Sequence, residues 1–210
     1  PVLPYRNPKI IPSDAGIPDV LRKHGVGSVM IVTDASIRSL GLTAFLEKTL
    51  KENDISYCIY DRTVANPTIW NVEEAKDLYL KEGAQALIAF GGGSSMDTAK
   101  AIGIIIKNPE FADVRSLEGV ADTKNKAVPI FAVPTTAGTA AEVTINYVIT
   151  DAEKNRKMVC VDPHDIPVVA FIDPDMMSSM PKGLTAATGM DALTHAIEGY
   201  ITAGAWELSD

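Results

Sequence analysis

The chain has 210 residues and a mass of 22.4 kDa, which is long enough for one large domain or for one domain and part of another. A hydrophobic fraction of 46% and a charged fraction of 22% exclude disordered, collagen-like and coiled-coil proteins. The net charge of -8 argues against general binding of nucleic acid, although backbone N–H groups in a loop can still hold a nucleotide.

Short apolar runs alternate with amphipathic stretches over the first part of the chain. Strands are predicted at residues 28–33, 56–60, 86–90 and 129–133, and helices at 37–51, 72–81 and 97–106. Strands joined by helices predict a doubly wound, mostly parallel sheet, and continuous apolar strands fit burial on both faces. The predicted fold class is therefore α/β and Rossmann-like.

The pattern changes after the fourth strand. Strand-like runs follow at 144–150, 157–161 and 168–172, with a predicted hairpin turn between the first two, and the sequence becomes helical near Met180 and Pro181. We place an α/β domain at 1–180 and the first helix of an all-helical domain at 181–210. Since about 30 helical residues cannot bury a core of their own, we expect this second domain to be incomplete here.

The sequence argues against a membrane protein. No apolar stretch approaches the ~20 residues that cross a bilayer, and the start, PVLPYRNPKIIPSDAG, lacks the order of a signal peptide. Cys58 and Cys160 each lie in an apolar run and are better explained as buried free thiols than as a disulfide. We therefore expect a cytoplasmic protein with no membrane partner.

A glycine-rich turn follows the strand at 86–90 and reads GGGSSMDTAK. Glycines let the backbone approach a ligand, and the N-terminus of the next helix favours an anion such as a pyrophosphate. The turn is neither a Walker A loop nor G-x-G-x-x-G, because Met96 replaces the last glycine. A capping box of Ser94 and Asp97 explains the same residues without a ligand. We favour the phosphate site, with which capping can coexist.

Two other polar positions follow predicted strands. Residues 134–142, PTTAGTAAE, offer threonine hydroxyls beside Gly138, although Thr139 and Glu142 also have capping-box spacing. Two polar strand-to-helix turns in one parallel sheet predict a ligand site at the carboxyl ends of the strands. Asp34 ends the first strand, where a carboxylate can bind an adenosine ribose, but its place before the glycine loop makes helix capping the better interpretation from spacing alone.

Asp191 and His195 share one face of the helical segment and can provide two metal ligands, with Glu198 continuing that face. An aspartate and a histidine at this spacing usually form an ordinary surface contact. Because an unpaired carboxylate is costly on so apolar a helix, the metal site and the surface contact are about equally good interpretations. The sequence holds no G-x-S-x-G elbow and no H-E-x-x-H motif. Nucleophilic catalysis is disfavoured, which leaves a reaction that depends on a nucleotide and a metal.

Four motifs in the same order resemble the iron-containing (group III) alcohol dehydrogenases: GGGSSMDTAKAIG, PTTAGTAAEVT, FIDPDMMSSMP and ATGMDALTHAIEGY. The resemblance runs over nearly the whole chain. It implies an N-terminal NAD-binding α/β domain and a C-terminal all-helical metal domain, with the active site in the cleft between them.

The resemblance assigns roles to the positions that match. Asp34 would contact the adenosine ribose, against the preference from spacing, and Asn66 would lie near the adenosine. Gly92, Gly93 and Ser94 would hold the pyrophosphate. The rest of the cofactor cleft would be formed by Thr135, Thr136, Thr139, Asn146, Val148, Lys157 and Leu184.

Asp191 and His195 would be two of four metal ligands, and the family takes the other two from histidines that lie beyond this chain. We therefore expect little or no catalysis by this chain alone. The complete protein would be a homodimer that transfers hydride between NAD and a short-chain alcohol or diol, giving the aldehyde, with Fe²⁺ or Zn²⁺ as the Lewis acid.

Two alternatives remain open. One is a non-catalytic nucleotide-binding module. The other is a lyase similar to dehydroquinate synthase, which also pairs NAD with a metal; such an enzyme needs basic residues for an acidic substrate, and the helical segment offers only Lys182. No further catalytic residue is assigned.

Overall fold

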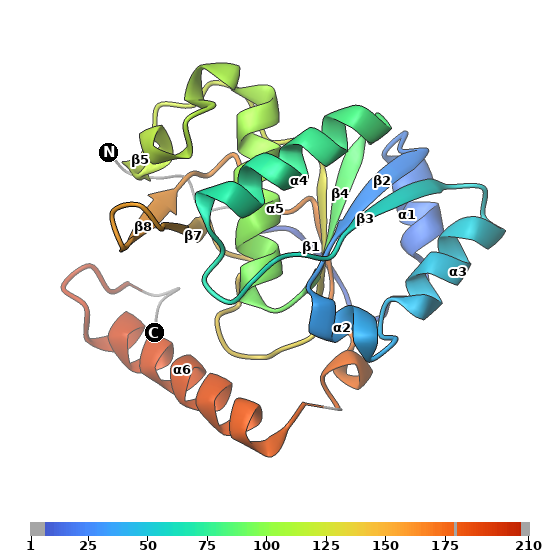
Figure 1. Ribbon diagram of the computed structural model, residues 1–210. Coiled ribbons are helices and arrows are strands. Elements are labelled where there is room, and N and C mark those ends of the chain that lie inside the picture. The colour runs from blue at the N-terminus through green and yellow to red at the C-terminus, as the bar shows by residue number, and fades with distance from the viewer. Residues whose placement is uncertain (1–6, 179, 207–210) are drawn as a thin grey trace.

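The computed structural model describes residues 7–178 and 180–206, and its main sheet confirms the predicted α/β class (Figure 1). All neighbouring strands in this sheet are parallel. Across the sheet the six strands are β1 (Lys9–Ile11), β9 (Val169–Phe171), β6 (Ile130–Pro134), β4 (Ala86–Gly91), β2 (Ser28–Val32) and β3 (Ser56–Tyr60). The four strands predicted before residue 143 are all present, whereas the three-residue β1 was not predicted.

Helices cover both faces of this sheet, as a doubly wound fold requires. One core lies under α4 (Ile69–Glu82) and α5 (Gly93–Lys107), and the other lies under α1 (Ile17–Lys23) and α3 (Ala44–Glu52). In β2, Met30 belongs to the first core and Ile31 to the second. Because successive side chains of a strand point to opposite faces, the central strands are apolar at almost every position.

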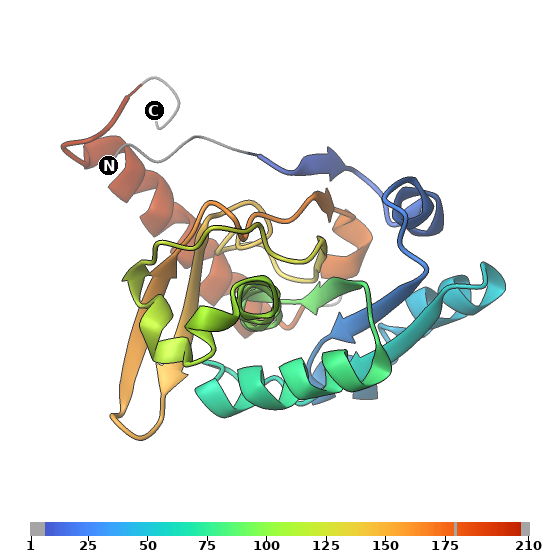
Figure 2. The ribbon, with the colours of Figure 1, turned by 90° about the horizontal axis from the view of Figure 1, so that it is seen from above.

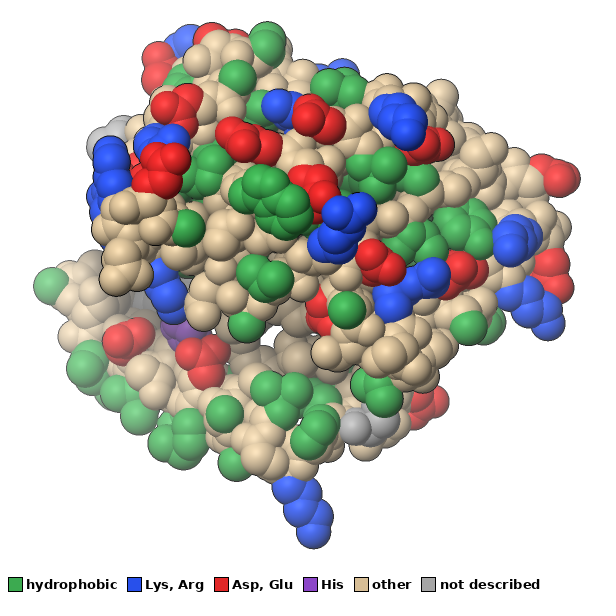
Figure 3. Space-filling view, in the orientation of Figure 1, with side chains coloured by type: hydrophobic (Ala, Val, Ile, Leu, Met, Phe, Trp, Pro, Cys, Tyr) green, Lys and Arg blue, Asp and Glu red, His purple; other side chains and the backbone are tan. Residues whose placement is uncertain are grey.

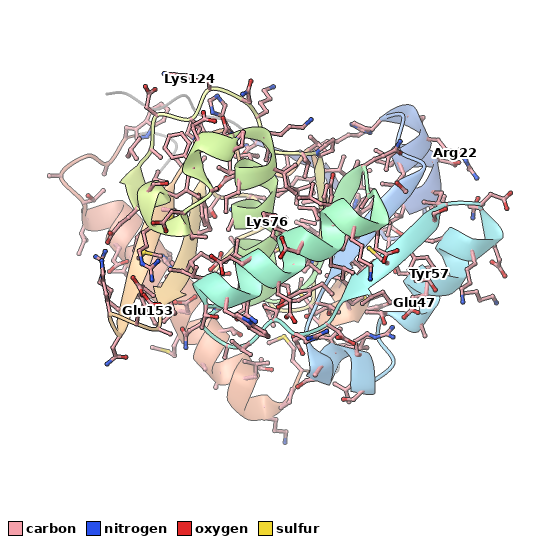
Figure 4. The ribbon with its side chains drawn as sticks, turned by 45° about the horizontal axis from the view of Figure 1, so that its top comes forward. Arg22, Glu47, Tyr57, Lys76, Lys124 and Glu153 are labelled. Carbon is pink, nitrogen blue, oxygen red and sulfur yellow. The ribbon has the colours of Figure 1, made fainter. Side chains whose placement is uncertain are left out.

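The prediction of one helix over 37–51 is wrong. The chain forms α2 (Ala35–Ser39) and then α3, separated by Gly41 in the left-handed region with φ of 71°. Figure 4 shows Glu47 of α3 near Tyr57 of β3, and the Tyr57 hydroxyl donates to Glu47 over 3.3 Å. Arg38 of α2 also pairs with Glu47. The apolar periodicity of 37–51 is therefore real, but a glycine turn interrupts it.

A second, three-stranded sheet contains the predicted hairpin. β7 (Asn146–Asp151) and β8 (Arg156–Val161) are antiparallel, and β5 (Gly119–Val120) pairs with β8. Figure 2 shows α5 almost end-on, between this hairpin and the main sheet. The three short 3-10 helices, Pro109–Phe111, Val114–Leu117 and Pro174–Met177, were not predicted.

Helix α6 (Lys182–Ile201) begins where the sequence predicts the change to helical structure. The helix ends at Ile201, so the prediction that it continues through residues 202–206 is wrong. Residues 207–210 lie outside the described residues. None of its residues is buried, and Figure 3 shows its apolar side chains at the surface. In the described part of the chain, no helix is long and apolar enough to span a membrane. The division into two domains at residue 180 stays a prediction.

Candidate nucleotide and metal site

A cavity of about 680 Å³ lies at the carboxyl ends of β2, β4 and β6, between the sheet and the start of α6. From β2 the chain continues to β3 on one side of β2 and then crosses to β4 on the opposite side of β2. The carboxyl ends of β2 and β4 therefore form a topological switch point, where ligands of α/β proteins bind. The volume lies within the range of small-molecule and cofactor sites. The structure brings eight of the twelve predicted cofactor residues to its walls: Asp34, Gly92, Gly93, Ser94, Thr135, Thr136, Thr139 and Leu184.

The three glycines bring two loops together. Gly91 has φ of 145°, and a Cβ there would lie 2.6 Å from Ser95 Oγ. A Cβ on Gly92 would lie 3.2 Å from Thr136 Oγ1, and one on Gly93 would lie 3.2 Å from Thr139 Oγ1. Gly92 and Gly93 therefore let the loop after β4 lie close against the threonine loop after β6, and a side chain at either position would push the two loops apart.

Helix α5 begins at this glycine loop, and no side chain caps it. Its N-cap residue is Gly92, so the alternative in which Ser94 and Asp97 form a capping box is wrong. Two buried hydroxyls among the cavity-lining residues, on Thr63 and Ser95, have no hydrogen-bond partner in the described part of the chain. An uncapped helix N-terminus, a glycine cradle and unpaired hydroxyls together fit the pyrophosphate of a dinucleotide.

Asp34 both caps a helix and lines the cavity. Its Oδ1 accepts a hydrogen bond of 2.9 Å from the Ile37 N–H, so the carboxylate caps α2. It also lines the cavity, and its Oδ2 lies 3.9 Å from the position that a Cβ of Gly91 would take. The cap that spacing favoured is thus present, and it holds a carboxylate at the predicted cofactor site.

The loop after β6 differs from the prediction in one respect. No helix follows it before β7, so the alternative in which Thr139 and Glu142 form a capping box is wrong. Thr139 Oγ1 instead accepts from the Ala141 N–H over 3.3 Å.

Four predicted cofactor residues do not line the cavity. Asn66 is exposed on the loop before α4 with φ of 57°, while Asn146, Val148 and Lys157 belong to the β7–β8 hairpin. Their contact with a cofactor stays a prediction.

Two charged residues of α5 that were not predicted to act in the site attach the helix to β7. The buried Lys100 ammonium donates to Thr144 O over 2.6 Å and to Asn146 O over 2.9 Å. One turn earlier, burial raises the pKa of Asp97 to about 6, and a hydrogen bond from the Val148 backbone partly opposes this. The motif D-T-A-K already placed both side chains on one face of a helix that starts at the phosphate site, which is the signal that could have identified them.

Lys100 has one further charged neighbour. Its ammonium lies 4.0 Å from Asp165 Oδ1, and neither oxygen of this fully buried carboxyl has a hydrogen-bond partner among the described residues. Burial therefore raises the pKa of Asp165 and lowers the pKa of Lys100. The hydrogen bonds of Lys100 hold α5 to the start of β7 behind the cavity.

The predicted metal pair lies on α6. Asp191 Oδ1 and His195 Nε2 are 3.6 Å apart, and Glu198 Oε2 lies 4.0 Å from the other ring nitrogen. A carboxylate oxygen and an imidazole nitrogen are good ligands for Fe²⁺ or Zn²⁺, so the pair fits part of a coordination sphere. Among the described residues, no group of three or more His, Cys, Asp or Glu side chains could hold a metal ion.

The free cysteines differ slightly from expectation. Neither forms a disulfide and Cys160 is buried, but Cys58 is only partly buried. Burial raises the pKa of Cys58 to about 11 and that of Cys160 to about 12, so neither thiol is a nucleophile at neutral pH.

Comparison with known proteins identifies the family of this chain. The family model for iron-containing alcohol dehydrogenase matches residues 13–174. The chain belongs to the iron-containing alcohol dehydrogenase family. The resemblance based on the four motifs is therefore confirmed.

Individual members of this family are similar over nearly all of the chain. Lactaldehyde reductase from Escherichia coli (strain K12) is 60% identical over 192 residues, which cover 91% of this chain and 50% of that protein. The chain thus spans about half the length of the curated relatives it matches.

Solved structures agree with the sequence comparison. A 1,3-propanediol oxidoreductase has a TM-score of 0.93 at 34% identity, over 100% of this chain and 56% of that one. Sulfoacetaldehyde reductase from Bifidobacterium kashiwanohense, solved in complex with NAD+, has a TM-score of 0.83 at 29% identity, over 97% of this chain and 55% of that one. These structural similarities confirm the predicted α/β fold class of this chain.

Proposed function

We propose that this chain provides the nucleotide site and two metal ligands of an NAD-dependent oxidoreductase that interconverts a short-chain alcohol or diol with its aldehyde. The observation that carries the proposal is the cavity in which the uncapped N-terminus of α5 and the glycine cradle lie opposite the helix of Asp191 and His195. Family membership favours this function over the lyase alternative.

Different residues of the chain bind the nucleotide and the metal ion. The N–H groups at the start of α5 hold the pyrophosphate, and the Asp34 carboxylate accepts hydrogen bonds from the adenosine ribose. Asp191 and His195 hold a divalent ion, Fe²⁺ by family or alternatively Zn²⁺, together with further ligands. When bound, the nucleotide supplies the hydride acceptor and the ion supplies Lewis acidity. The apolar cavity residues Leu184 and Met180 exclude water from the cleft.

The names of the relatives support the substrate class. One of the compared enzymes is named for lactaldehyde and another for 1,3-propanediol, which are both small oxygenated molecules. We propose a substrate of this size, lactaldehyde or 1,2-propanediol being the best example, for the whole protein.

Calorimetric titration of the chain with NAD and with NADP tests the nucleotide site. We expect saturable binding of NAD and weaker binding of NADP, because a 2′-phosphate beside Asp34 meets a like charge. If the folded chain bound neither nucleotide at millimolar concentration, the proposed function would be refuted.

A further inference from the structure

Helix α6 contacts the rest of the chain at few positions. Of its 20 residues, only Thr188, Asp191 and Gly199 are partly buried, and the others are exposed. Thr188 and Leu184 line the nucleotide cavity from the side of α6. The position of this helix therefore depends strongly on what touches Thr188.

The residue that touches Thr188 is Gly138, in the loop after β6. A Cβ on Gly138 would lie 2.8 Å from Thr188 Cβ, 2.9 Å from Thr188 O and 3.2 Å from Thr188 Cα. Two of these atoms belong to the helix backbone, so a change of side-chain rotamer cannot relieve the contact. Gly138 does not have a φ in the left-handed region, so proximity to α6, and not backbone conformation, requires glycine here.

The contact joins the two sets of residues that the proposed function needs. Thr136 and Thr139, on either side of Gly138, line the cavity and contact the glycine cradle. Asp191 and His195 follow Thr188 by three and seven residues, which places all three on one helical face. A shift of α6 at Thr188 would thus move the metal pair relative to the cofactor loop.

We propose that Gly138 is a positioning residue, whose missing side chain sets the distance between the cofactor loop and the helix that carries the metal ligands. The expected effect on NAD binding rests on the proposed function. The packing of α6 directly on Gly138 does not, and it can be tested without a nucleotide.

The test compares Gly138→Ala with Gly189→Ala, a matched change on α6 where an added Cβ meets no atom within 4 Å. We expect the dissociation constant for NAD to rise about tenfold in Gly138→Ala, since part of one apolar wall moves away, and to stay within about twofold in the control. The double variant Gly138→Ala/Thr188→Gly lacks the nearest Cβ. Its loss of NAD affinity, measured against Thr188→Gly alone, should be smaller than the loss that Gly138→Ala causes in the unmodified chain. A loop that is merely destabilised would not respond to this second change.

Hydrogen exchange of the unliganded chain separates this proposal from the proposed function. In Gly138→Ala, amides of residues 182–195 should exchange faster while those of β4 and β6 are unchanged, which also shows that the sheet is folded. Equal exchange of α6 in Gly138→Ala and Gly189→Ala would overturn the positioning role, whether or not NAD binds. Undiminished NAD affinity in Gly138→Ala, in a chain that binds NAD, would overturn it as well.

Discussion

Asp34 shows how one side chain can satisfy two demands at a strand end. Its Oδ1 is used to cap α2, and the carboxylate as a whole lies in the wall of the cavity. A neutral residue that still caps the helix can therefore separate the role of the charge from the role in folding. Serine and asparagine are both good N-cap residues.

Asp34→Ser should narrow the preference for NAD over NADP by about tenfold, because it removes a negative charge that a 2′-phosphate would face. The melting temperature should change little, since the serine hydroxyl can still accept from the Ile37 N–H. Dissociation constants for both nucleotides measure the effect. The assignment of Asp34 fails if the unmodified chain binds NAD and NADP equally well.

Gly92→Ala tests the glycine cradle itself. The added Cβ would lie 3.2 Å from Thr136 Oγ1, so the threonine loop must move away from the phosphate site. We expect NAD affinity to fall about tenfold with the fold intact, because the loop lies outside both cores. Gly27→Ala is the control, since its Cβ would be 3.7 Å from Gln85 Oε1, an ordinary contact. Equal affinities in both variants would mean that the loop is only a turn.

The sequence predicted much of this site at the scale of single residues, for an identifiable reason. Glycines, threonines and an aspartate directly after apolar runs mark strand ends, and parallel strands bring such ends together. Lys100 was missed because its hydrogen-bond partners are mostly backbone carbonyls more than 40 positions further along the chain. The D-T-A-K motif places Lys100 and Asp97 on one helical face, but the motif does not show that tertiary packing buries them.

At the scale of elements, the attachment of α5 to β7 depends on Lys100. Lys100→Met should lower the free energy of unfolding by about 3 kcal/mol, because it removes a fully buried ammonium that donates to the carbonyls of Thr144 and Asn146. Lys107→Met, at the exposed end of the same helix, should change it by less than about 0.5 kcal/mol. Urea unfolding at neutral pH measures both. A loss no larger than that of Lys107→Met would show that this ammonium does not hold the two elements together.

Asp97 should make the stability of the same pair of elements depend on pH. Burial raises its pKa from 3.8 to about 6, so between about pH 4 and 6 the folded chain keeps a proton that the unfolded chain has lost. This contribution to stability is present below pH 4 and is lost as the pH rises, by at most about 1.4 kcal/mol per pH unit.

Asp97→Asn, which resembles the protonated acid, should therefore make the fall in unfolding free energy between pH 4 and 6 shallower by about that amount per unit. Asp165 and Glu142, whose pKa values burial also raises, keep part of the slope in the variant. Asp122→Asn, at a side chain that is 88% exposed, is the control substitution. An identical slope in Asp97→Asn and the unmodified chain would contradict the assignment.

The elements that were predicted wrongly share a physical cause. The apolar period of residues 37–51 does not register that Gly41 can take a left-handed conformation, which breaks the helix. In the loop after β6, the spacing of Thr139 and Glu142 resembles a helix start, but no helix forms there, and Lys100 binds the carbonyls of Thr144 and Asn146 instead. In both cases the spacing of a few side chains predicts a helix, and a backbone turn or a tertiary contact overrides it.

At the scale of the whole molecule, the nucleotide site and the metal pair differ in how well they are fixed. The glycine cradle rests on two buried cores, whereas Asp191 and His195 stand on a helix with no buried residue. A site on a well-packed sheet is preorganised, and ligands on an exposed helix are not. The two functions should therefore separate in this chain.

We expect the 210-residue chain to bind NAD but to show no measurable turnover when it is loaded anaerobically with Fe²⁺ or Zn²⁺. A catalytic metal site needs about three protein ligands and an open position, and the described residues offer two. With so few ligands the ion stays largely hydrated and exchanges readily, so its Lewis acidity acts on water. Loss of NADH absorbance with lactaldehyde measures turnover, and calorimetry measures binding.

Lactaldehyde reductase from Escherichia coli, about twice as long as this chain and similar to it over one half, is the positive control in the same assay. Asp191→Ala and His195→Ala should each abolish the weak binding of Zn²⁺ by this chain while leaving its affinity for NAD within about twofold, since neither residue lines the cavity. Robust turnover by the unmodified chain would mean that other side chains complete the metal site, and the assignment of two ligands to α6 would then be insufficient.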